Sequence, residues 1–171
     1  MTAKKGSGLD MHRPLALWPL LFLLLFLALG GLYGGIAMLT DPTGGSLQLT
    51  EVLPLLPVAD FILPGVFLLV MMGLVPLLLI YGLLACPKWD WSLALPYLGK
   101  YHWSWIGTVG LAVVLGIWLL VQGALIGFKW PIQYVTAING ILIVLLALVP
   151  NVRKRYRSSS PHTKLADHVV S

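Results

Sequence analysis

Residues 17–40 read LWPLLFLLLFLALGGLYGGIAMLT, an apolar run that contains no Asp, Glu, Lys, Arg or His. A helix of about 20 such residues crosses the hydrocarbon core of a bilayer, which is roughly 30 Å thick. An N-terminal apolar run can also be a cleaved signal peptide, but the core of a signal peptide is only about 7–15 residues long. We therefore expect a retained membrane-spanning helix here.

Three further runs have the same character, at residues 62–86, 105–128 and 131–150. The chain of 171 residues is 58% hydrophobic and only 10% charged, whereas soluble domains carry about 25% charged residues. The sequence therefore predicts an all-α integral membrane protein, a four-helix transmembrane bundle that occupies residues 14–150. Residues 1–13 and 151–171 are expected to be polar cytoplasmic tails, the second of them basic and disordered.

The distribution of Lys and Arg predicts the orientation, because cytoplasmic loops carry the excess of positive charge. An even number of spans puts ten of the eleven Lys and Arg residues on one side and leaves Lys129 alone on the other. We expect a multi-pass protein of the cytoplasmic (inner) membrane with both termini in the cytoplasm. The longer loop, between the first two spans, then lies outside the cytoplasm.

The net charge of +5 is compatible with binding to nucleic acid, but the basic segment NVRKRYR directly follows the fourth span. We interpret this segment as a topology determinant and a contact for anionic lipid headgroups. No nucleic-acid partner is expected. The single cysteine, Cys86, excludes an internal disulfide or a CxxC pair.

Catalysis inside a membrane normally uses charged side chains within the bundle, and the four predicted spans contain no Asp, Glu, Lys, Arg or His. The four histidines fall in predicted cytoplasmic segments without metal-ligand spacing, and no GxSxG motif is present. We therefore expect no catalytic residue, no metal and no cofactor, and we expect that the protein is not an enzyme.

The loop between the first two spans begins with DPTGG, at residues 41–45. This is a turn sequence, because Asp41 can cap the turn and the glycines accept positive φ angles. Asp60 is expected to cap the second span, with Pro64 in its first turn. The apolar stretch between these points predicts a short interfacial helix or an apolar lid over the bundle.

Two amides lie within the spans, Gln122 and Asn139. They are expected either to form hydrogen bonds between helices or to line a polar pocket in the outer half of the bundle. In the second interpretation the DPTGG loop closes the pocket, and Trp118 and Lys129 border it. We also expect Lys129 to pair with Asp41 or Asp60.

Glycines spaced four residues apart form GxxxG patterns in the first and third spans. Such patterns let two helix backbones approach closely, either inside the bundle or between two copies of the protein. The glycines are Gly30, Gly31, Gly34, Gly35, Gly123 and Gly127.

The segments GGIAMLTDPTGGSLQL, DFILPG and IWLLVQGALIG, followed by KWPIQYVTAINGILIVLLAL, resemble those of a family of small bacterial four-helix integral membrane proteins. The resemblance covers residues 30–150 and implies the architecture, without a particular activity. The positions that match the family's pattern are Asp41, Pro42, Gly44, Asp60, Pro64, Gly65, Trp118 and Gln122.

Two functions remain open from the sequence. The first is a non-catalytic accessory or organising subunit, with the bilayer and a membrane protein or a second copy as partners. The alternative is a protein that binds or transports a small molecule or a lipid through the outer-half pocket, as an oligomer.

Overall fold

The computed structural model describes residues 14–85 and 101–157. Four helices in these ranges are long and apolar enough to cross a membrane, Leu17–Thr40, Ile62–Ala85, Trp103–Ile126 and Pro131–Leu148. They are α1, the continuous helix made of α2 (Ile62–Phe67), η3 (Leu68–Leu74) and α3 (Val75–Ala85), then α4 and α5. The predicted all-α, four-span architecture is confirmed, with boundaries that differ by at most a few residues.

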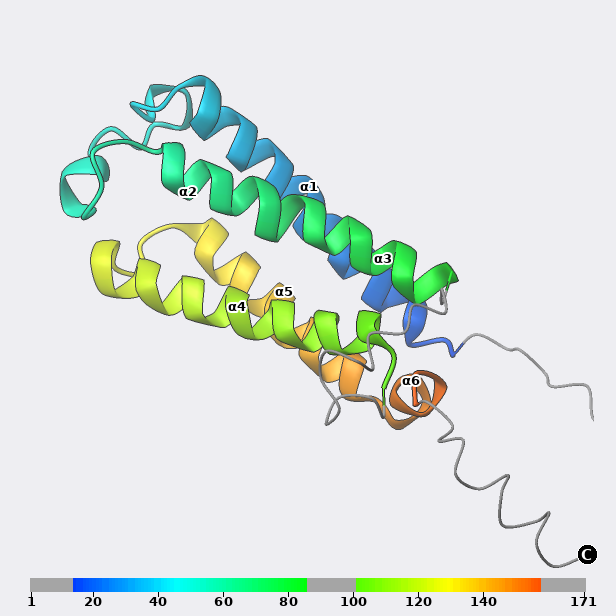
Figure 1. Ribbon diagram of the computed structural model, residues 1–171. Coiled ribbons are helices and arrows are strands. Elements are labelled where there is room, and N and C mark those ends of the chain that lie inside the picture. Colours follow the sequence, from blue (N-terminus) through cyan, green and yellow to red (C-terminus); the bar gives the residue numbers. More distant parts are fainter. Residues whose placement is uncertain (1–13, 86–100, 158–171) are drawn as a thin grey trace, which may run out of the picture.

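The four spans form two antiparallel hairpins that pack side by side (Figure 1). α1 contacts the second span and α5, while α4 contacts α3 and α5. The loop of residues 41–61 lies at one end of the bundle, hereafter the loop end. The start of α1 and the short helix α6 (Pro150–Arg155) lie at the other, hereafter the α6 end.

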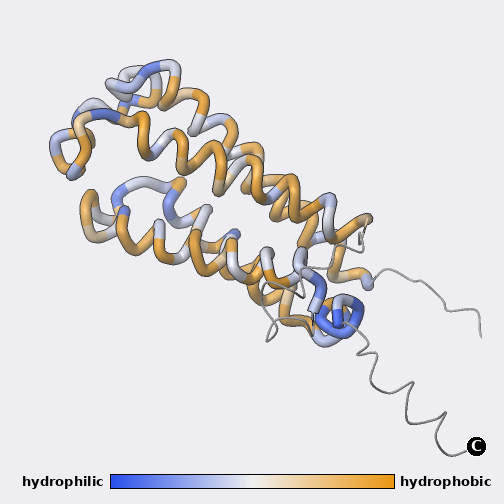
Figure 2. The backbone as a smooth tube through the Cα atoms, in the orientation of Figure 1, coloured by the Kyte–Doolittle hydropathy of each residue, from blue (hydrophilic) through white to orange (hydrophobic). Residues whose placement is uncertain are grey.

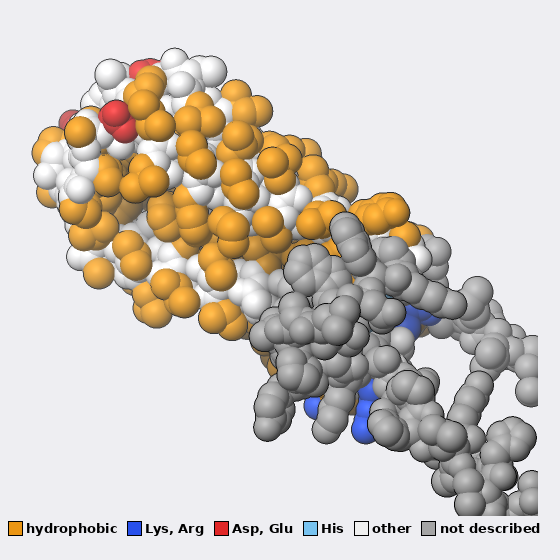
Figure 3. Space-filling view, viewed as in Figure 1, with side chains coloured by type: hydrophobic (Ala, Val, Ile, Leu, Met, Phe, Trp, Pro, Cys, Tyr) orange, Lys and Arg blue, Asp and Glu red, His pale blue; other side chains and the backbone are white. Residues whose placement is uncertain are grey.

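Hydropathy follows this arrangement, because apolar residues run along the spans and polar ones gather at the two ends (Figure 2). On the face shown in Figure 3, hydrophobic side chains cover the spans and acidic side chains lie at the loop end. Many large apolar side chains point outward, among them Leu15, Phe22, Leu63 and Leu120. A bilayer is the solvent that such a surface requires.

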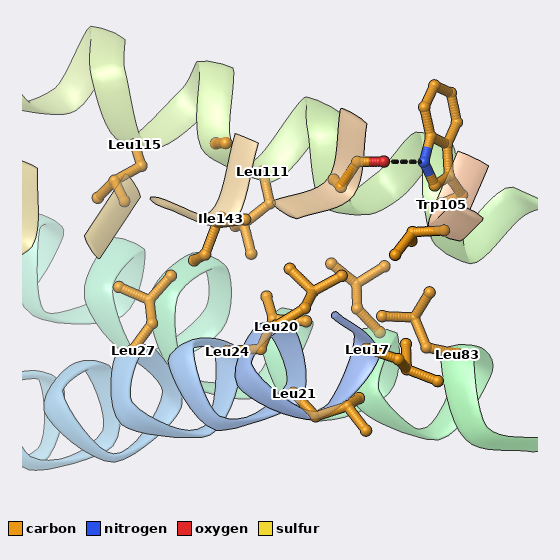
Figure 4. Packing of buried hydrophobic residues seen from close by; sticks show 14 of the residues in the cluster. Leu17, Leu20, Leu21, Leu24, Leu27, Leu83, Trp105, Leu111, Leu115 and Ile143 are labelled. Carbon is orange, nitrogen blue, oxygen red and sulfur yellow. Dashed lines mark hydrogen bonds between the residues drawn. The ribbon is translucent and has the colours of Figure 1, made fainter. Parts of the chain in front are cut away.

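The core lies between the helices and is built mainly from leucines. Leu17, Leu20, Leu24 and Leu27 of α1 face the other hairpin (Figure 4), where Ile143 of α5 is fully buried. These α1 positions recur every three or four residues, so they share one face of the helix. The hydrophobic stripe of α1 therefore holds the two hairpins together.

The middle of the second span is π-helical, which the sequence analysis did not predict. The N–H of Val75 donates to the carbonyl of Val70, five residues earlier. Pro76 comes next, and a proline lacks its own N–H and clashes with the carbonyl four residues before it. The wider π turn accommodates this proline in the middle of the span.

Two side chains tie the α6 end of the bundle together across distant segments. Trp105 Nε1 donates to the carbonyl of Ala147, at 2.8 Å, and Tyr156 Oη donates to the carbonyl of Leu83, at 2.7 Å. Both side chains are buried. Because the last carbonyls of a helix have no partner within it, these bonds complete the ends of α5 and α3.

α6 begins at Pro150 and continues into residues 151–171, the segment that the sequence predicts to be a disordered tail. Val152 and Tyr156 are buried against the bundle, so the first part of that segment is helical and packed. Residues 1–13, 86–100 and 158–171 lie outside the described residues. They include the rest of both predicted tails, Cys86 and most of the predicted cytoplasmic loop between the second and third spans.

Candidate functional site

Asp41 organises the start of the loop, directly after the last residue of α1. Its carboxylate accepts hydrogen bonds from Thr43 Oγ1 at 2.6 Å and from the backbone N–H groups of Thr43 and Ser46. The Thr43 hydroxyl, and after it the Ser46 N–H, hold the pKa of Asp41 below its ordinary value of 3.8. The carboxylate therefore serves as the centre of a turn.

The first glycine of the DPTGG turn has the positive φ that the turn needs, with Gly44 at φ 78°. The aromatic ring of Phe61 packs where a Cβ of Gly44 would lie, and the N–H of Phe61 donates to the carbonyl of Pro42. The two ends of the loop are thereby joined. Between them the loop contains two 3₁₀ turns, η1 (Gly45–Leu47) and η2 (Leu53–Leu55), in place of a regular interfacial helix.

Asp60 and Lys129 occupy separate positions at the loop end. Asp60 Oδ1 accepts from the N–H of Ile62, the first residue of α2. The N-cap residue is Phe61, which has no side-chain cap, so Asp60 binds the helix start from one residue earlier than the sequence predicts. The backbone N–H of Lys129 donates to Gln133 Oε1. Within the described ranges no ion pair joins Lys129 to Asp41 or Asp60.

Trp118 and Gln122 lie on α4, one turn apart. The ring of Trp118 stacks on that of Phe67 in α2, with centroids 4.4 Å apart. This stack joins the two hairpins on the side of the bundle nearer the loop end. Gln122 is half-buried and forms no hydrogen bond with another described residue.

Asn139 is buried in α5 and faces α1, since its Nδ2 donates to the carbonyl of Leu23 at 3.4 Å. Its Oδ1 is buried and has no hydrogen-bond partner. This contact is the interhelical bond that one sequence-based interpretation expects. It does not bring Asn139 into hydrogen-bond contact with Gln122.

The four glycines of the two overlapping GxxxG patterns in α1 have two different environments. A Cβ on Gly31 would lie 2.3 Å from the backbone carbon of Met72, and one on Gly35 would lie 2.7 Å from the Leu69 nitrogen. Gly31 and Gly35 therefore allow α1 to touch the π-helical backbone. Gly30 has no atom within 4 Å of its Cβ position, and Gly34 has only a Leu68 methyl at 3.8 Å.

The two glycines near the end of α4 serve the turn between α4 and α5. Gly127 ends α4 with φ 75°, a conformation that glycine accepts at little cost. The ring of Phe128 occupies the space beside Gly123 where a Cβ would lie. These two glycines therefore permit the chain to fold back at the loop end.

Three buried polar groups, on the side chains of Gln133, Trp103 and Arg155, were not predicted from the sequence. Gln133 is buried at the start of α5, where its Oε1 accepts from the N–H groups of Lys129 and Trp130 while its Nε2 has no partner. The spacing of Pro131 and Gln133, at the first and third positions of the helix, is a capping signal that predicts this role. Trp103 Nε1 and Arg155 Nε, at the α6 end, are also buried without partners.

The polar side chains are spread over several places instead of converging on one centre. Among the described residues, no group of three or more His, Cys, Asp or Glu side chains is placed to hold a metal ion. Thr108 and Thr136 both donate to carbonyls four residues earlier in their own helices. Most of the hydrogen bonds that polar side chains form within the bundle therefore stabilise helices and turns.

Comparison with known proteins identifies no family, because no family model, no curated protein and no solved structure matches the chain. The resemblance carried by the DPTGG and DFILPG segments stays a prediction. What the geometry and the four apolar helices support is a multi-pass membrane protein.

Proposed function

We propose that the protein is a non-catalytic accessory or organising subunit of the cytoplasmic membrane, with both termini in the cytoplasm. The described charges support this orientation, since four of the five Lys and Arg residues lie between residues 153 and 157 at the α6 end. The described carboxylates, Asp41, Glu51 and Asp60, lie in the loop at the other end. Cytoplasmic faces carry the excess of positive charge.

The proposal depends most on how the bundle uses its polar groups. Trp105, Tyr156 and Asn139 each donate to a backbone carbonyl of another helix. No Asp, Glu, Lys, Arg or His is present in the spans to supply proton transfer. A bundle of this kind acts through its surfaces, which touch lipid and other membrane proteins.

The outward face of α4 is the surface best suited to a partner helix. Only 22% of the most apolar stretch of α4 is buried inside the structure, against 39% for α1. Gly110 and Gly116 lie at the two edges of this face, about 120° apart around the helix axis, and neither has an atom within 4 Å of its Cβ position. Glycine within a helix costs about 0.5–1 kcal/mol relative to alanine, and here no contact inside the chain offsets that cost. Close approach of a second helix would offset it.

Native mass spectrometry after mild solubilisation from the native membrane tests the proposal. We expect the wild-type chain to emerge with a second membrane polypeptide in fixed ratio, and its mass would show whether that is another copy. Gly110→Leu combined with Gly116→Leu should release the partner without lowering the melting temperature. Val113→Leu, on the same exposed face, is the matched control and should retain it. A wild-type chain that emerges alone would contradict the proposal.

A second candidate function is binding of a small molecule or lipid in the half of the bundle nearer the loop end. The observation that favours it is the pair of unpartnered buried atoms on α5, Asn139 Oδ1 and Gln133 Nε2. A buried polar atom without a partner costs about 1–3 kcal/mol, which a ligand with a hydroxyl or carbonyl group would recover. A small molecule retained by the wild type and lost from Asn139→Leu would support this function.

A further inference from the structure

α6 concentrates positive charge at one end of the bundle. Its buried side consists of Val152 and Tyr156, so the rest of the helix is held against the ends of the spans. Lys154 and Arg157 are exposed, and Arg153 is held in place because its Nε donates to Tyr101 Oη at 2.9 Å. No carboxylate from the described ranges lies at this end to neutralise the charge.

The residues that precede α4 pair in antiparallel orientation with those that follow α6. Tyr101 and Arg157 form an isolated antiparallel bridge, and the N–H of His102 donates to the carbonyl of Tyr156 at 2.7 Å. Trp103 and Arg155 each adjoin this hydrogen-bonded backbone pair. The pairing therefore brings the segments that carry an indole and a guanidinium to the same end of the bundle, at the level where the spans end.

Both of these side chains carry a donor that is not used. Trp103 Nε1 and Arg155 Nε are buried, and neither has a hydrogen-bond partner. Unpaired buried donors are rare in proteins because they have lost water without gaining an acceptor. Two such donors at the same end of the bundle, with cations beside them, indicate an anionic acceptor that enters from the membrane surface.

We propose that the start of α4 and the end of α6 together bind the phosphate group of one anionic phospholipid. Trp103 Nε1 and Arg155 Nε donate to its oxygens, while Lys154 and Arg157 supply the surrounding charge. A phospholipid is the natural source of this anion, because its phosphate lies at the level where membrane spans end and tryptophan side chains collect. The inference deepens the proposed contact with lipid headgroups, and it does not require the protein partner.

A specific site and a diffuse attraction respond differently to substitution. Diffuse attraction depends on charge alone and weakens by about fivefold for each cation removed. Arg155→Lys keeps the charge but removes the Nε donor, and Trp103→Phe keeps an aromatic ring but removes the indole N–H. Only a site that uses both donors is sensitive to these two changes.

The experiment uses the isolated full-length chain in nanodiscs of mixed phosphatidylglycerol and phosphatidylcholine, with retained lipids measured by native mass spectrometry. We expect one phosphatidylglycerol to be retained by the wild type. Arg155→Lys and Trp103→Phe should each reduce its retention by about tenfold, the effect of losing one hydrogen bond to a charged group. Trp130→Phe, which removes an indole N–H at the loop end of the bundle, is the matched control and should behave as the wild type.

Two results would overturn the inference. The first is a wild-type chain with no preference for phosphatidylglycerol over phosphatidylcholine, which needs no variant to observe. The second is unchanged retention in both Arg155→Lys and Trp103→Phe, because charge alone would then account for the preference. Since the isolated chain is used, failure of the partner proposal leaves this measurement unaffected.

Discussion

Gly31→Ala tests whether the contact between α1 and the π-helical part of the second span depends on the absence of a side chain. The new methyl group would lie 2.3 Å from the backbone carbon of Met72, 2.5 Å from its oxygen and 2.6 Å from the nitrogen of Gly73. Non-bonded carbon atoms are in optimal contact at about 3.5 Å or more. The two helix backbones would therefore have to separate by roughly 1.2 Å at this point, because none of these atoms belongs to a flexible side chain.

The expected cost follows from two opposing effects. Excess volume in a well-packed interior costs about 1–3 kcal/mol, whereas alanine in place of glycine favours the helix by about 0.5–1 kcal/mol. We expect Gly31→Ala to lower the free energy of unfolding by about 1–2 kcal/mol. The adjacent Gly30 is the matched control, since its Cβ position has no atom within 4 Å. Gly30→Ala should therefore raise the free energy of unfolding by the helix preference of alanine alone, about 0.5–1 kcal/mol.

The assay is reversible unfolding of both variants in mixed micelles with an increasing fraction of sodium dodecyl sulfate, followed by circular dichroism. Because both variants gain the same helix propensity, the difference between their free energies of unfolding isolates the packing cost, about 1–3 kcal/mol. Equal midpoints for Gly30→Ala and Gly31→Ala would refute the reasoning, because α1 would then not depend on close backbone contact at Gly31.

Three further predictions concern the two ends of the bundle. Trp105→Phe keeps the ring that stacks on Tyr101 but removes the donor to the Ala147 carbonyl, so the same unfolding assay should show a loss of about 1–2 kcal/mol. Lys129→Ala should change the free energy of unfolding by no more than an ordinary surface substitution does, about 0.5 kcal/mol, and a larger loss would reveal a pairing with the loop carboxylates. Hydrogen bonds lower the pKa of Asp41 in the folded chain, so its stabilising effect is present above the ordinary pKa of 3.8 and is lost as pH falls through the lower folded value. Hydrogen exchange of the 41–61 loop should therefore rise only in strong acid, and Asp41→Asn, which lacks this titration, should remove that pH dependence.

The four spans were predictable because each consists of a long apolar segment that a bilayer requires to be helical. The loop turn was predictable for a local reason, since Asp41, Gly44 and Asp60 act on backbone groups only a few residues away. The π-helical segment was not predicted. Pro76 signals a disturbed helix, but the choice between a kink and a π turn depends on the neighbouring helix.

The polar side chains show the same division between local and distant causes. That Asn139 lies within a span follows from its position in the sequence, whereas its bond to Leu23, 116 residues away, follows from the packing of α5 on α1. The bridge between Tyr101 and Arg157 likewise requires the start of α4 and the end of α6 to meet at one end of the bundle.

The sequence by itself determined the number of spans, their limits to within a few residues and the turn that follows the first span. Each of these depends on the affinity of a contiguous segment for lipid or on hydrogen bonds within a turn. Only the tertiary structure decided which glycines face a neighbouring helix and which face outward, and which buried donors and acceptors lack a partner. All spans here are apolar on every side, so hydropathy does not distinguish the packed face of a helix from its lipid-facing one, and only the fit between helices does.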